Sequence, residues 1–280
     1  FISNSDIKVI YWLVFAWYMQ YIYYSSHMHT RTKIVCTIGP STDSYKSIEK
    51  LALAGMNVAR INMSHANHGS AKKIISYVNK FNNNNDSKIA VLLDTQGPEI
   101  RTGDRELPMD LKLGDIVSLT VRDQVDVETS SIKINYKDLI KSVKKGSRIS
   151  VDNGLINFEV ISKDHETLEC KVLDGGKLGS KRHVNLPGVR INLPSITAKD
   201  KDDIKFGIGQ KVDFIALSFV RNARDVSELN KILINQKSSA KVISKIENYE
   251  GLDNIDEICT SSWGVMVARG DLGIETSLTN

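Results

Sequence analysis

The chain has 280 residues, enough for one large domain or two medium ones. Its 41% hydrophobic and 25% charged residues are typical of a globular protein and argue against an intrinsically disordered chain. The net charge of +4 is too small to indicate a nucleic-acid-binding protein, although it suits anionic small substrates.

The cysteines and histidines give little indication of a disulfide or metal framework. Cys36, Cys170 and Cys259 are far apart and form no CxxC pair, which argues against disulfides and a structural zinc site and favours a reducing compartment. His65 and His68 are close in sequence. They are either part of a metal site or exposed loop histidines.

Residues 1–30 differ from the rest of the chain. The sequence begins at Phe1 rather than Met, so we expect a fragment or a partial gene product. An aromatic stretch, VIYWLVFAWYMQYIYY, occupies residues 9–24. It is shorter than the roughly 20 apolar residues of a membrane-spanning helix and lacks the features of a signal peptide. Membrane association is therefore not expected; a buried helix and a foreign stretch are the other interpretations.

Helices and strands are predicted to alternate in residues 31–97. Three apolar runs predict strands: KIVCTIG, MNVARINMSH and KIAVLLD. Between the first two lies DSYKSIEKLALAG, where Ile48, Leu51 and Ala52 form one helical face and Gly55 is placed to end the helix.

The pattern changes between residues 98 and 193. Four segments alternate apolar and polar residues with period two, separated by Gly, Asp and Asn turns: DIVSLTV, SIKINY, SRISVDNGLINFEVI and TLECKVL. This pattern predicts a small antiparallel β domain inserted into the helix–strand repeat.

The helix–strand repeat returns in residues 194–280. Thr197 and Asp200 form a capping pattern at the start of a helix, and the strand VDFIALSF follows. Two more helix–strand pairs are ARDVSELNKILINQ with KVISKI, and EGLDNIDEICTS with WGVMVA. Together with residues 31–97, this gives six nearly continuous apolar strands, which is typical of a parallel sheet covered by helices.

Polar and charged residues follow these apolar runs. In parallel β/α barrels, catalytic groups collect at the carboxyl ends of the strands. Arg60, Asn62 and Ser64 are spaced two apart, so an extended chain places them on one face. A guanidinium beside neutral oxygens can hold a phosphate and help to bind a hard cation, and Asp94 and Thr95 add further oxygens.

A second set of charges lies at the ends of the last two predicted strands. Lys245 and Glu247 are two residues apart, and Asp271 follows the next strand. Glu247 and Asp271 can share one Mg²⁺, which prefers oxygen ligands. A lysine beside a metal and a phosphate can stabilise charge that develops during group transfer. For each residue taken singly, a structural salt bridge is the alternative.

Common nucleotide-binding motifs are absent from the sequence. The segment DGGKLGS at 174–180 lacks the GxxxxGK[ST] spacing of a phosphate loop, and the Gly-x-Gly at 207–209 is a weaker signal. No protein-kinase set of catalytic-loop motifs occurs. A nucleotide must therefore be held in another way.

Seven segments, in chain order, resemble pyruvate kinase: TKIVCTIGPST, GMNVARINMSH, LLDTQGPEIRTG, VNLPGVRINLPSITAKDKDDI, DFIALSFVRNARDV, SKIENYEGLDNIDEI and GVMVARGDLGIE. The resemblance runs from about residue 31 to 275. It implies an α/β fold: an incomplete (β/α)8 TIM barrel of about six strands with an inserted all-β barrel lid domain. The barrel would comprise residues 31–97 and 194–280, the lid 98–193, and the segment 1–30 has no assigned role.

The resemblance implies transfer of the phosphoryl group of phosphoenolpyruvate to ADP, giving pyruvate and ATP, as the last step of glycolysis. It implies Mg²⁺, or Mn²⁺, and K⁺ as cofactors. The implied catalytic residues are Lys245 and Arg60, which also bind substrate together with Gly270. The implied nucleotide-binding residues are Asn62, His65, Arg101 and Arg182. The implied metal ligands are Glu247 and Asp271 for Mg²⁺, and Asn62, Ser64, Asp94 and Thr95 for K⁺.

The resemblance also implies a cytoplasmic protein of a usually homotetrameric family, without nucleic-acid or membrane partners. The inserted domain would act as a lid that excludes water, which otherwise could take the phosphoryl group.

The sequence departs from the family pattern at two places. Arg182 and His183 replace the usual Lys-Gly, so we expect altered nucleotide contact, because a planar guanidinium replaces a point charge. The pattern also ends after Glu275, before the last two barrel strands and the C-terminal domain. Two alternatives follow: a noncatalytic fragment that binds nucleotide or metal or associates with full-length subunits, and another phosphoenolpyruvate or pyruvate barrel enzyme, such as a lyase.

Overall fold

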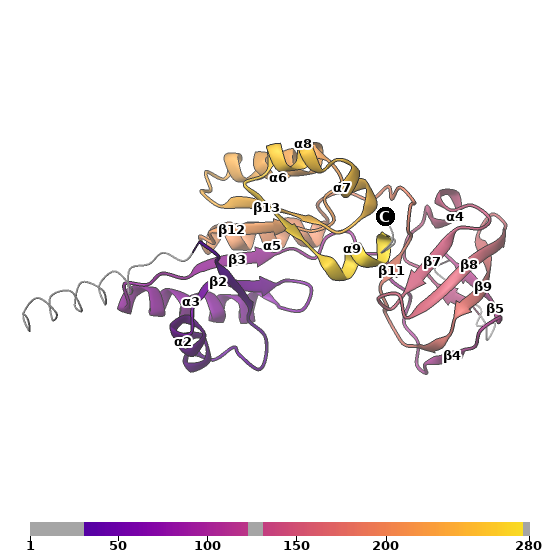
Figure 1. The fold of residues 1–280 in the computed structure, drawn as a ribbon, viewed down its shortest axis with the longest axis horizontal. Coiled ribbons are helices and arrows are strands. Elements are labelled where there is room, and N and C mark those ends of the chain that lie inside the picture. Colours follow the sequence, from indigo (N-terminus) through magenta and orange to yellow (C-terminus); the bar gives the residue numbers. More distant parts are fainter. Residues whose placement is uncertain (1–30, 123–130, 277–280) are drawn as a thin grey trace, which may run out of the picture.

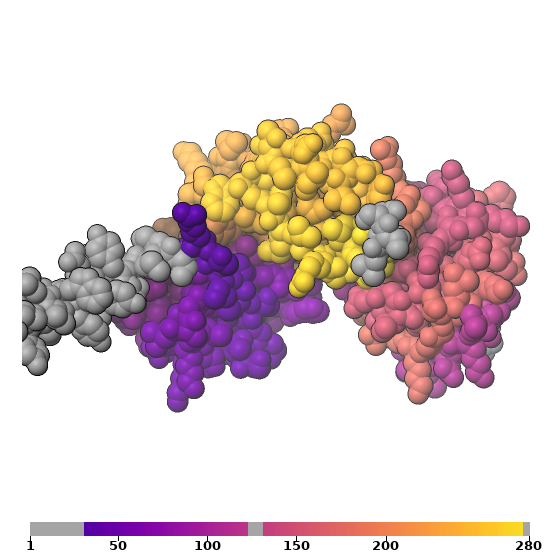
Figure 2. Space-filling view, in the orientation of Figure 1, coloured from indigo at the N-terminus to yellow at the C-terminus, as the bar shows by residue number. Residues whose placement is uncertain are grey.

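The structure is a computed structural model that describes residues 31–122 and 131–276. The aromatic stretch predicted at 9–24 lies outside the described residues. Two bodies are seen along the long axis of the molecule: a helix-covered parallel sheet, and a β domain formed by the middle of the chain (Figure 1; Figure 2). Among the described residues, no helix is both long and apolar enough to cross a membrane.

The first body is built on a sheet of six parallel strands, in the order β1-β2-β3-β12-β13-β14. The strands are β1 (Ile34–Thr37), β2 (Met56–Asn62), β3 (Ala90–Asp94), β12 (Phe214–Leu217), β13 (Lys241–Ile246) and β14 (Gly264–Val267). The six predicted strands are therefore confirmed. Because β3 pairs directly with β12, the inserted segment leaves the sheet after one strand and returns at its neighbour.

Helices follow the strands as the sequence predicted. They are α2 (Tyr45–Leu53), α3 (His68–Asn84), α5 (Ala198–Gly209), α6 (Ala223–Asn235), α7 (Tyr249–Asp253), α8 (Ile255–Ser261) and α9 (Arg269–Glu275). The predicted cap of α5 is present as a capping box. The Thr197 side chain accepts a hydrogen bond from the backbone N–H of Asp200, and the Asp200 side chain accepts one from the backbone N–H of Thr197. Gly55 ends α2 with a φ of +109°, a conformation that favours glycine.

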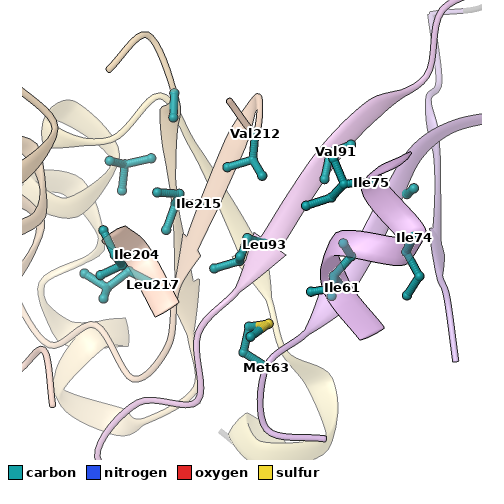
Figure 3. Close-up of a cluster of buried hydrophobic side chains, with 14 of the residues drawn as sticks. Ile61, Met63, Ile74, Ile75, Val91, Leu93, Ile204, Val212, Ile215 and Leu217 are labelled. Carbon is teal, nitrogen blue, oxygen red and sulfur yellow. The ribbon is translucent and has the colours of Figure 1, made fainter. Parts of the chain in front are cut away.

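A hydrophobic core fills the space between the sheet and its helices (Figure 3). Alternate residues of β2, β3 and β12 point toward α3 and α5, and the labelled members of this cluster are Ile61, Met63, Ile74, Ile75, Val91, Leu93, Ile204, Val212, Ile215 and Leu217. Each fully buried side chain of this size stabilises the fold by about 1.5–3 kcal/mol. This packing holds the carboxyl ends of the central strands in place.

The inserted β domain, defined as residues 109–185, has its own hydrophobic core. Its main sheet has the order β11-β7-β8-β9-β5-β6, and β10 pairs with β4. Its elements are β4 (Met109–Leu111), β5 (Ile116–Thr120), β6 (Ser131–Lys133), α4 (Leu139–Ser142), β7 (Arg148–Val151), β8 (Ile156–Lys163), β9 (Thr167–Asp174), β10 (Gly176–Leu178) and β11 (Val184–Asn185).

The expectation of a wholly antiparallel domain is wrong at one pair. Strands β5 and β6 are parallel, while the other pairs of this sheet are antiparallel. Period-two alternation shows that a strand has one buried face, but it carries no information about the direction of its neighbour.

The two edge strands of the parallel sheet are less covered than the four central ones. Ile34 and Val35 of β1 and Val265 and Val267 of β14 are exposed apolar residues. Their sequence reads as buried because parallel strands are normally covered on both faces. In this structure the covering helices reach β2, β3, β12 and β13 but leave these edges open.

Candidate functional site

Polar side chains meet where the central parallel strands end. The strand order places β3 between β2 and β12, and β13 beside β12, so residues from distant parts of the chain become neighbours. Asp94 at the end of β3 is paired in register with Asn62 of β2 and Ala216 of β12. The sheet therefore brings the strand ends predicted from sequence to one edge.

Lys245 is the centre of this group. Lys245 is only 9% exposed, and its Nζ lies 3.2 Å from Asp94 Oδ1 and 2.9 Å from Glu247 Oε1. It also donates a hydrogen bond of 2.8 Å to Ser218 Oγ. An ammonium has three N–H donors, and these partners match that number. We call Arg60, Asp94, Ser218, Lys245 and Glu247 the Lys245 cluster.

Arg60 approaches the same aspartate from the other side. Its Nε donates to Asp94 Oδ2 at 2.7 Å, and its Nη1 donates to Thr37 Oγ1 at 2.7 Å. Asp94 is fully buried, whereas the Arg60 side chain is 23% exposed. The carboxylate therefore fixes two cations side by side, and the guanidinium keeps an open side toward solvent.

Burial and charge act against each other at Lys245 and Glu247. Burial by itself lowers the pKa of Lys245, but the carboxylates of Glu247 and Asp94 outweigh it, so that the pKa is raised. Burial raises the pKa of Glu247, and the charge of Lys245 opposes that shift. The lysine is therefore a firmly held cation, whose charge depends on the carboxylates beside it.

The two predicted Mg²⁺ ligands lie on different elements. Glu247 follows β13 and is buried, and its Oε2 accepts a hydrogen bond of 2.7 Å from the backbone N–H of Phe219. Asp271 lies in the first turn of α9 and is partly exposed. The charge of Asp271 contributes to the raised pKa of Glu247, after the larger effect of burial and the opposing effects of Lys245 and Phe219.

The predicted K⁺ ligands lie at or just after the ends of the neighbouring strands β2 and β3. Asn62 Oδ1 accepts from the backbone N–H of Ser64 at 3.0 Å. Thr95 Oγ1 donates to Ala216 O at 3.1 Å, so it ties β3 to β12. Among the described residues, no group of three or more His, Cys, Asp or Glu side chains is arranged to hold a metal ion. A cation at this edge would therefore need hydroxyl, amide, backbone or substrate oxygens as further ligands.

Asn62 is paired in register with Asp94 of the Lys245 cluster, whereas the other three predicted nucleotide residues have different partners. His65 is exposed in the turn after β2. The Arg101 guanidinium contacts Glu99 at 2.7 Å and Lys181 O at 2.7 Å, and Arg182 lies 3.3 Å from Asp152 in the inserted β domain. The contacts of Arg101 and Arg182 thus lie at the entry to that domain or inside it.

Gly270 and His68 have different surroundings from the nucleotide residues. Gly270 lies in α9, and a Cβ added there would meet no atom within 4 Å, so its backbone is open to approach. His68 begins α3; its Nε2 lies 2.8 Å from Asp203 Oδ1, and its ring stacks on Phe206. It is thus a packed helix-terminal residue, neither part of a pair with His65 nor an exposed loop histidine.

Three residues of this site were missed by the sequence analysis. Ser218 contacts Lys245 and donates to Thr95 O at 2.7 Å; Thr37 contacts Arg60; and Phe219 binds Glu247 through its backbone. Ser218 and Phe219 are the last two residues of the predicted strand VDFIALSF but directly follow β12 in the structure, and Thr37 ends β1. Their positions at strand ends were the available signal.

A cavity of about 370 Å³ lies beside the Lys245 cluster, between the sheet and the inserted β domain. His183 and Phe219 line it, together with Asn185, Tyr249 and Glu275. Neither Lys245 nor Arg60 lines this cavity. The opposed, buried charges of the Lys245 cluster make it the candidate site, because such groups gather at functional sites.

Comparison with known proteins agrees with this geometry. A family model described as the barrel domain of pyruvate kinase matches residues 29–280. The chain is 48% identical over 246 residues to plastidial pyruvate kinase 2 of Arabidopsis thaliana, covering 88% of this chain and 42% of that protein. It is 48% identical over 248 residues to a pyruvate kinase of Staphylococcus aureus, with the same coverage of 88% and 42%.

A solved structure gives the same answer. The structure of a pyruvate kinase from Cryptosporidium parvum superimposes with a TM-score of 0.84 at 39% identity, covering 89% of this chain and 52% of that one. The chain thus spans less than half the length of the two sequence relatives, and about half of this solved structure. These matches exclude the alternative interpretation of the chain as a lyase. The chain, with its incomplete TIM barrel and inserted lid, belongs to the pyruvate kinase family.

Proposed function

We propose that the Lys245 cluster is the phosphoryl-transfer site of a pyruvate kinase, which converts phosphoenolpyruvate and ADP to pyruvate and ATP. The observation that carries this proposal is the buried ammonium of Lys245, held between Asp94 and Glu247 with the Arg60 guanidinium beside it. Phosphoryl transfer needs little covalent chemistry from side chains, so positioned charge is what such a site must supply.

Arg60 and Lys245 would act on different parts of the reaction. The open side of the Arg60 guanidinium would bind oxygens of the transferring phosphoryl group. Lys245 would stabilise the charge of that group and of the enolate left behind. Because the three donors of Lys245 already have partners, substrate must replace one of them, and neutral Ser218 is the weakest competitor. The open backbone of Gly270 would receive the substrate carboxylate.

The chemistry of the donor set fits the two expected cations. Glu247 and Asp271 offer two carboxylates, the number that proteins commonly give to a Mg²⁺ or Mn²⁺ ion that also binds substrate. Both oxygens of Glu247 have one partner each, which leaves lone pairs for a cation. Asn62, Ser64, Asp94 and Thr95 supply neutral and charged oxygens for K⁺. When bound, the divalent ion would neutralise charge on the phosphoryl oxygens.

The nucleotide would be held between the two bodies of the molecule. Asn62 and His65 lie at the end of β2, Arg101 at the entry to the inserted β domain, and Arg182 within it. In the proposed division, residues 98–193 form the lid, and residues 31–97 and 194–280 form the barrel; two separate hydrophobic cores support it. Approach of the lid would bring Arg182 to the phosphates and exclude water.

Location and assembly belong to the proposal as well. We propose a cytoplasmic enzyme without nucleic-acid or membrane partners, from a family whose members are usually homotetramers, as the family resemblance implies. The absence of CxxC pairs favours a reducing compartment. One relative is named as a plastidial enzyme, so a plastid is the alternative compartment.

The proposal is tested by ATP formation from phosphoenolpyruvate and ADP. The chain of 280 residues would be assayed with Mg²⁺ and K⁺, with Lys245→Met as the matched inactive variant. Turnover that depends on Lys245 supports the proposal. A folded, monodisperse sample without turnover would refute catalysis by this chain.

A second candidate function rests on the exposed edges of the sheet. The apolar side chains of Ile34, Val35, Val265 and Val267 lie at the two edge strands, where unpaired backbone groups invite pairing with further strands. This favours a noncatalytic chain that associates with full-length subunits. Size-exclusion chromatography with a complete pyruvate kinase tests it: co-elution without turnover supports this candidate, and separate elution refutes it.

A further inference from the structure

Phe219 has an unusual backbone for its residue type. It directly follows Ser218, beyond the end of β12, and its φ is +55°. This left-handed conformation is disfavoured by the Cβ of every residue except glycine, and a bulky side chain rarely adopts it. Such an outlier persists only where surrounding contacts hold it, and it is a reason to ask what it does.

The backbone of Phe219 holds one of the proposed Mg²⁺ ligands. Its N–H donates to Glu247 Oε2 at 2.7 Å, while the other carboxylate oxygen faces Lys245. Hydrogen bonds to a carboxylate are shorter and stronger than those between neutral groups. The left-handed turn at Phe219 thus contributes to the orientation of the Glu247 carboxylate.

The ring of Phe219 faces two other segments. A Cβ added to Gly97 would lie 2.8 Å from the Phe219 ring, so the ring packs closely on that backbone. Its centroid also lies 5.9 Å from the imidazole of His183, with a tilt of 48°. Of the ring contacts among the described residues, this one joins the parallel-sheet body to the inserted β domain.

His183 completes a connection between the two carboxylates. It lies just before β11, its side chain is only 14% exposed, and its Nδ1 is 4.0 Å from Asp271 Oδ1. Of the two paired rings, Phe219 therefore belongs to a residue whose backbone binds Glu247, and His183 lies beside Asp271. Both rings also line the 370 Å³ cavity between the two bodies.

We propose that Phe219 is a positioning residue that couples the inserted β domain, through His183, to the orientation of the Glu247 carboxylate. This inference rests on the proposed function, in which Glu247 and Asp271 bind the divalent cation. Displacement of His183 removes one of the contacts that hold the Phe219 ring, so the left-handed turn is held less firmly and its N–H leaves Glu247 more often. By linkage, a bound divalent cation then favours the lid position in which His183 contacts Phe219.

The first test needs neither metal nor activity. Amide hydrogen exchange at Phe219 is measured by NMR in the full chain labelled with ¹⁵N-phenylalanine. His183→Ala is expected to speed this exchange at least about threefold, the scale of coupling between residues in contact. His165→Ala, at an exposed histidine of the same domain, is expected to leave it unchanged.

Two results of this experiment would overturn the proposal. One is an unchanged Phe219 exchange rate in His183→Ala. The other is equal acceleration in His165→Ala, which would indicate general loosening of the domain. Should His183→Ala fail to fold, His183→Phe keeps a ring against Phe219 and is expected to keep the slow exchange; fast exchange in that variant counts against the coupling.

The second test measures divalent-cation affinity through the water relaxation of bound Mn²⁺. Phe219→Gly permits the positive φ without strain but removes the ring, and we expect about threefold to tenfold weaker Mn²⁺ binding. His183→Ala added to Phe219→Gly is expected to weaken binding no further. Trp263→Leu removes a ring pair of the same 48° tilt at the amino ends of β12 and β14, and it serves as the control with unchanged affinity.

The outcomes separate this inference from the proposed function. A lower unfolding temperature for Phe219→Gly with unchanged Mn²⁺ affinity would mean a purely structural role and overturn the inference. Additive effects of His183→Ala and Phe219→Gly would do the same. If the unaltered chain does not bind Mn²⁺, the proposed metal site is refuted, and the exchange experiment alone decides the link between His183 and Phe219.

Discussion

Lys245→Met removes an ammonium from the centre of the site and keeps a side chain of similar length. In the structure, Lys245 Nζ faces Asp94 Oδ1 at 3.2 Å, Glu247 Oε1 at 2.9 Å and Ser218 Oγ at 2.8 Å. Methionine replaces none of these contacts. Two buried carboxylates would be left with fewer partners, and Asp94 would keep Arg60 as its cation.

The expected effects have two separate sizes. Turnover should fall by roughly 10²–10³, as loss of a group that stabilises transition-state charge typically does. Removing one partner of a buried ion pair destabilises by about 3–5 kcal/mol, because a charge is left uncompensated. The ionised form of Glu247 should be destabilised most. Burial already raises its pKa, and only the Lys245 charge and the Phe219 N–H oppose that shift.

The pH dependence gives this variant a further signature. Burial lowers the pKa of Lys245, but Glu247 and Asp94 raise it beyond the usual lysine value. The resulting stabilisation is fully present below the unfolded-state pKa and is lost as the pH rises through the folded-state pKa. Stability of the unaltered chain should therefore fall in the alkaline range above the usual lysine pKa, and Lys245→Met should lose that dependence.

The assay combines steady-state turnover with urea unfolding, using Lys241→Met as the matched control. Lys241 starts the same strand and is exposed, so its replacement should change neither quantity. Near-normal turnover of Lys245→Met in a chain that is active would remove Lys245 from the mechanism. An unchanged free energy of unfolding would show that the carboxylates do not depend on this cation.

Three further expectations concern the metal, the backbone and a thiol. Glu247→Gln should raise the Mg²⁺ concentration needed for half-maximal activity; an unchanged titration curve would refute the shared site. Gly97→Ala should lower the free energy of unfolding in urea by about 1–3 kcal/mol more than Gly188→Ala does. Both positions have a positive φ, but only the Cβ added at Gly97 would meet other atoms at 2.8 Å. Equal effects of the two substitutions would contradict this expectation. Burial raises the pKa of Cys170 to about 12, so Cys170 should resist a thiol reagent at pH 8 while exposed Cys259 reacts. The free energy of unfolding should also fall as the pH rises above the usual thiol pKa of 9.0. Rapid labelling of Cys170 in the folded chain would contradict its burial.

Much of the parallel sheet could be predicted because its signals are local. An apolar run bounded by polar residues identifies a strand, and a pattern such as Thr197 to Asp200 identifies the start of a helix. Lys245, Glu247 and Arg60 could be chosen as site residues because they lie at or next to strand ends, where the catalytic groups of parallel β/α barrels collect. The structure confirms that Lys245 and Glu247 are in contact, and that Arg60 and Asp94 are in contact.

Other features depended on which segments become neighbours. The parallel pairing of β5 with β6 follows from the path of the chain around the inserted β domain. The exposure of Ile34 and Val267 follows from their places at the sheet edges. Neither strand direction nor edge position leaves a mark in the period of apolar residues, and the antiparallel prediction was therefore wrong for β5 and β6.

By itself, the sequence determined the elements, their alternation and the residue types available for chemistry, because hydrophobic periodicity, caps and turns act between residues close in the chain. Only the tertiary structure decided which of these residues meet. Arg60 and Asp94 are joined by strand order across 34 positions, Lys245 reaches Ser218 across 27, and the strained turn at Phe219 faces Glu247 across 28. Such contacts exist because packing the sheet against its helices brings the strand ends together, and no local pattern encodes that proximity.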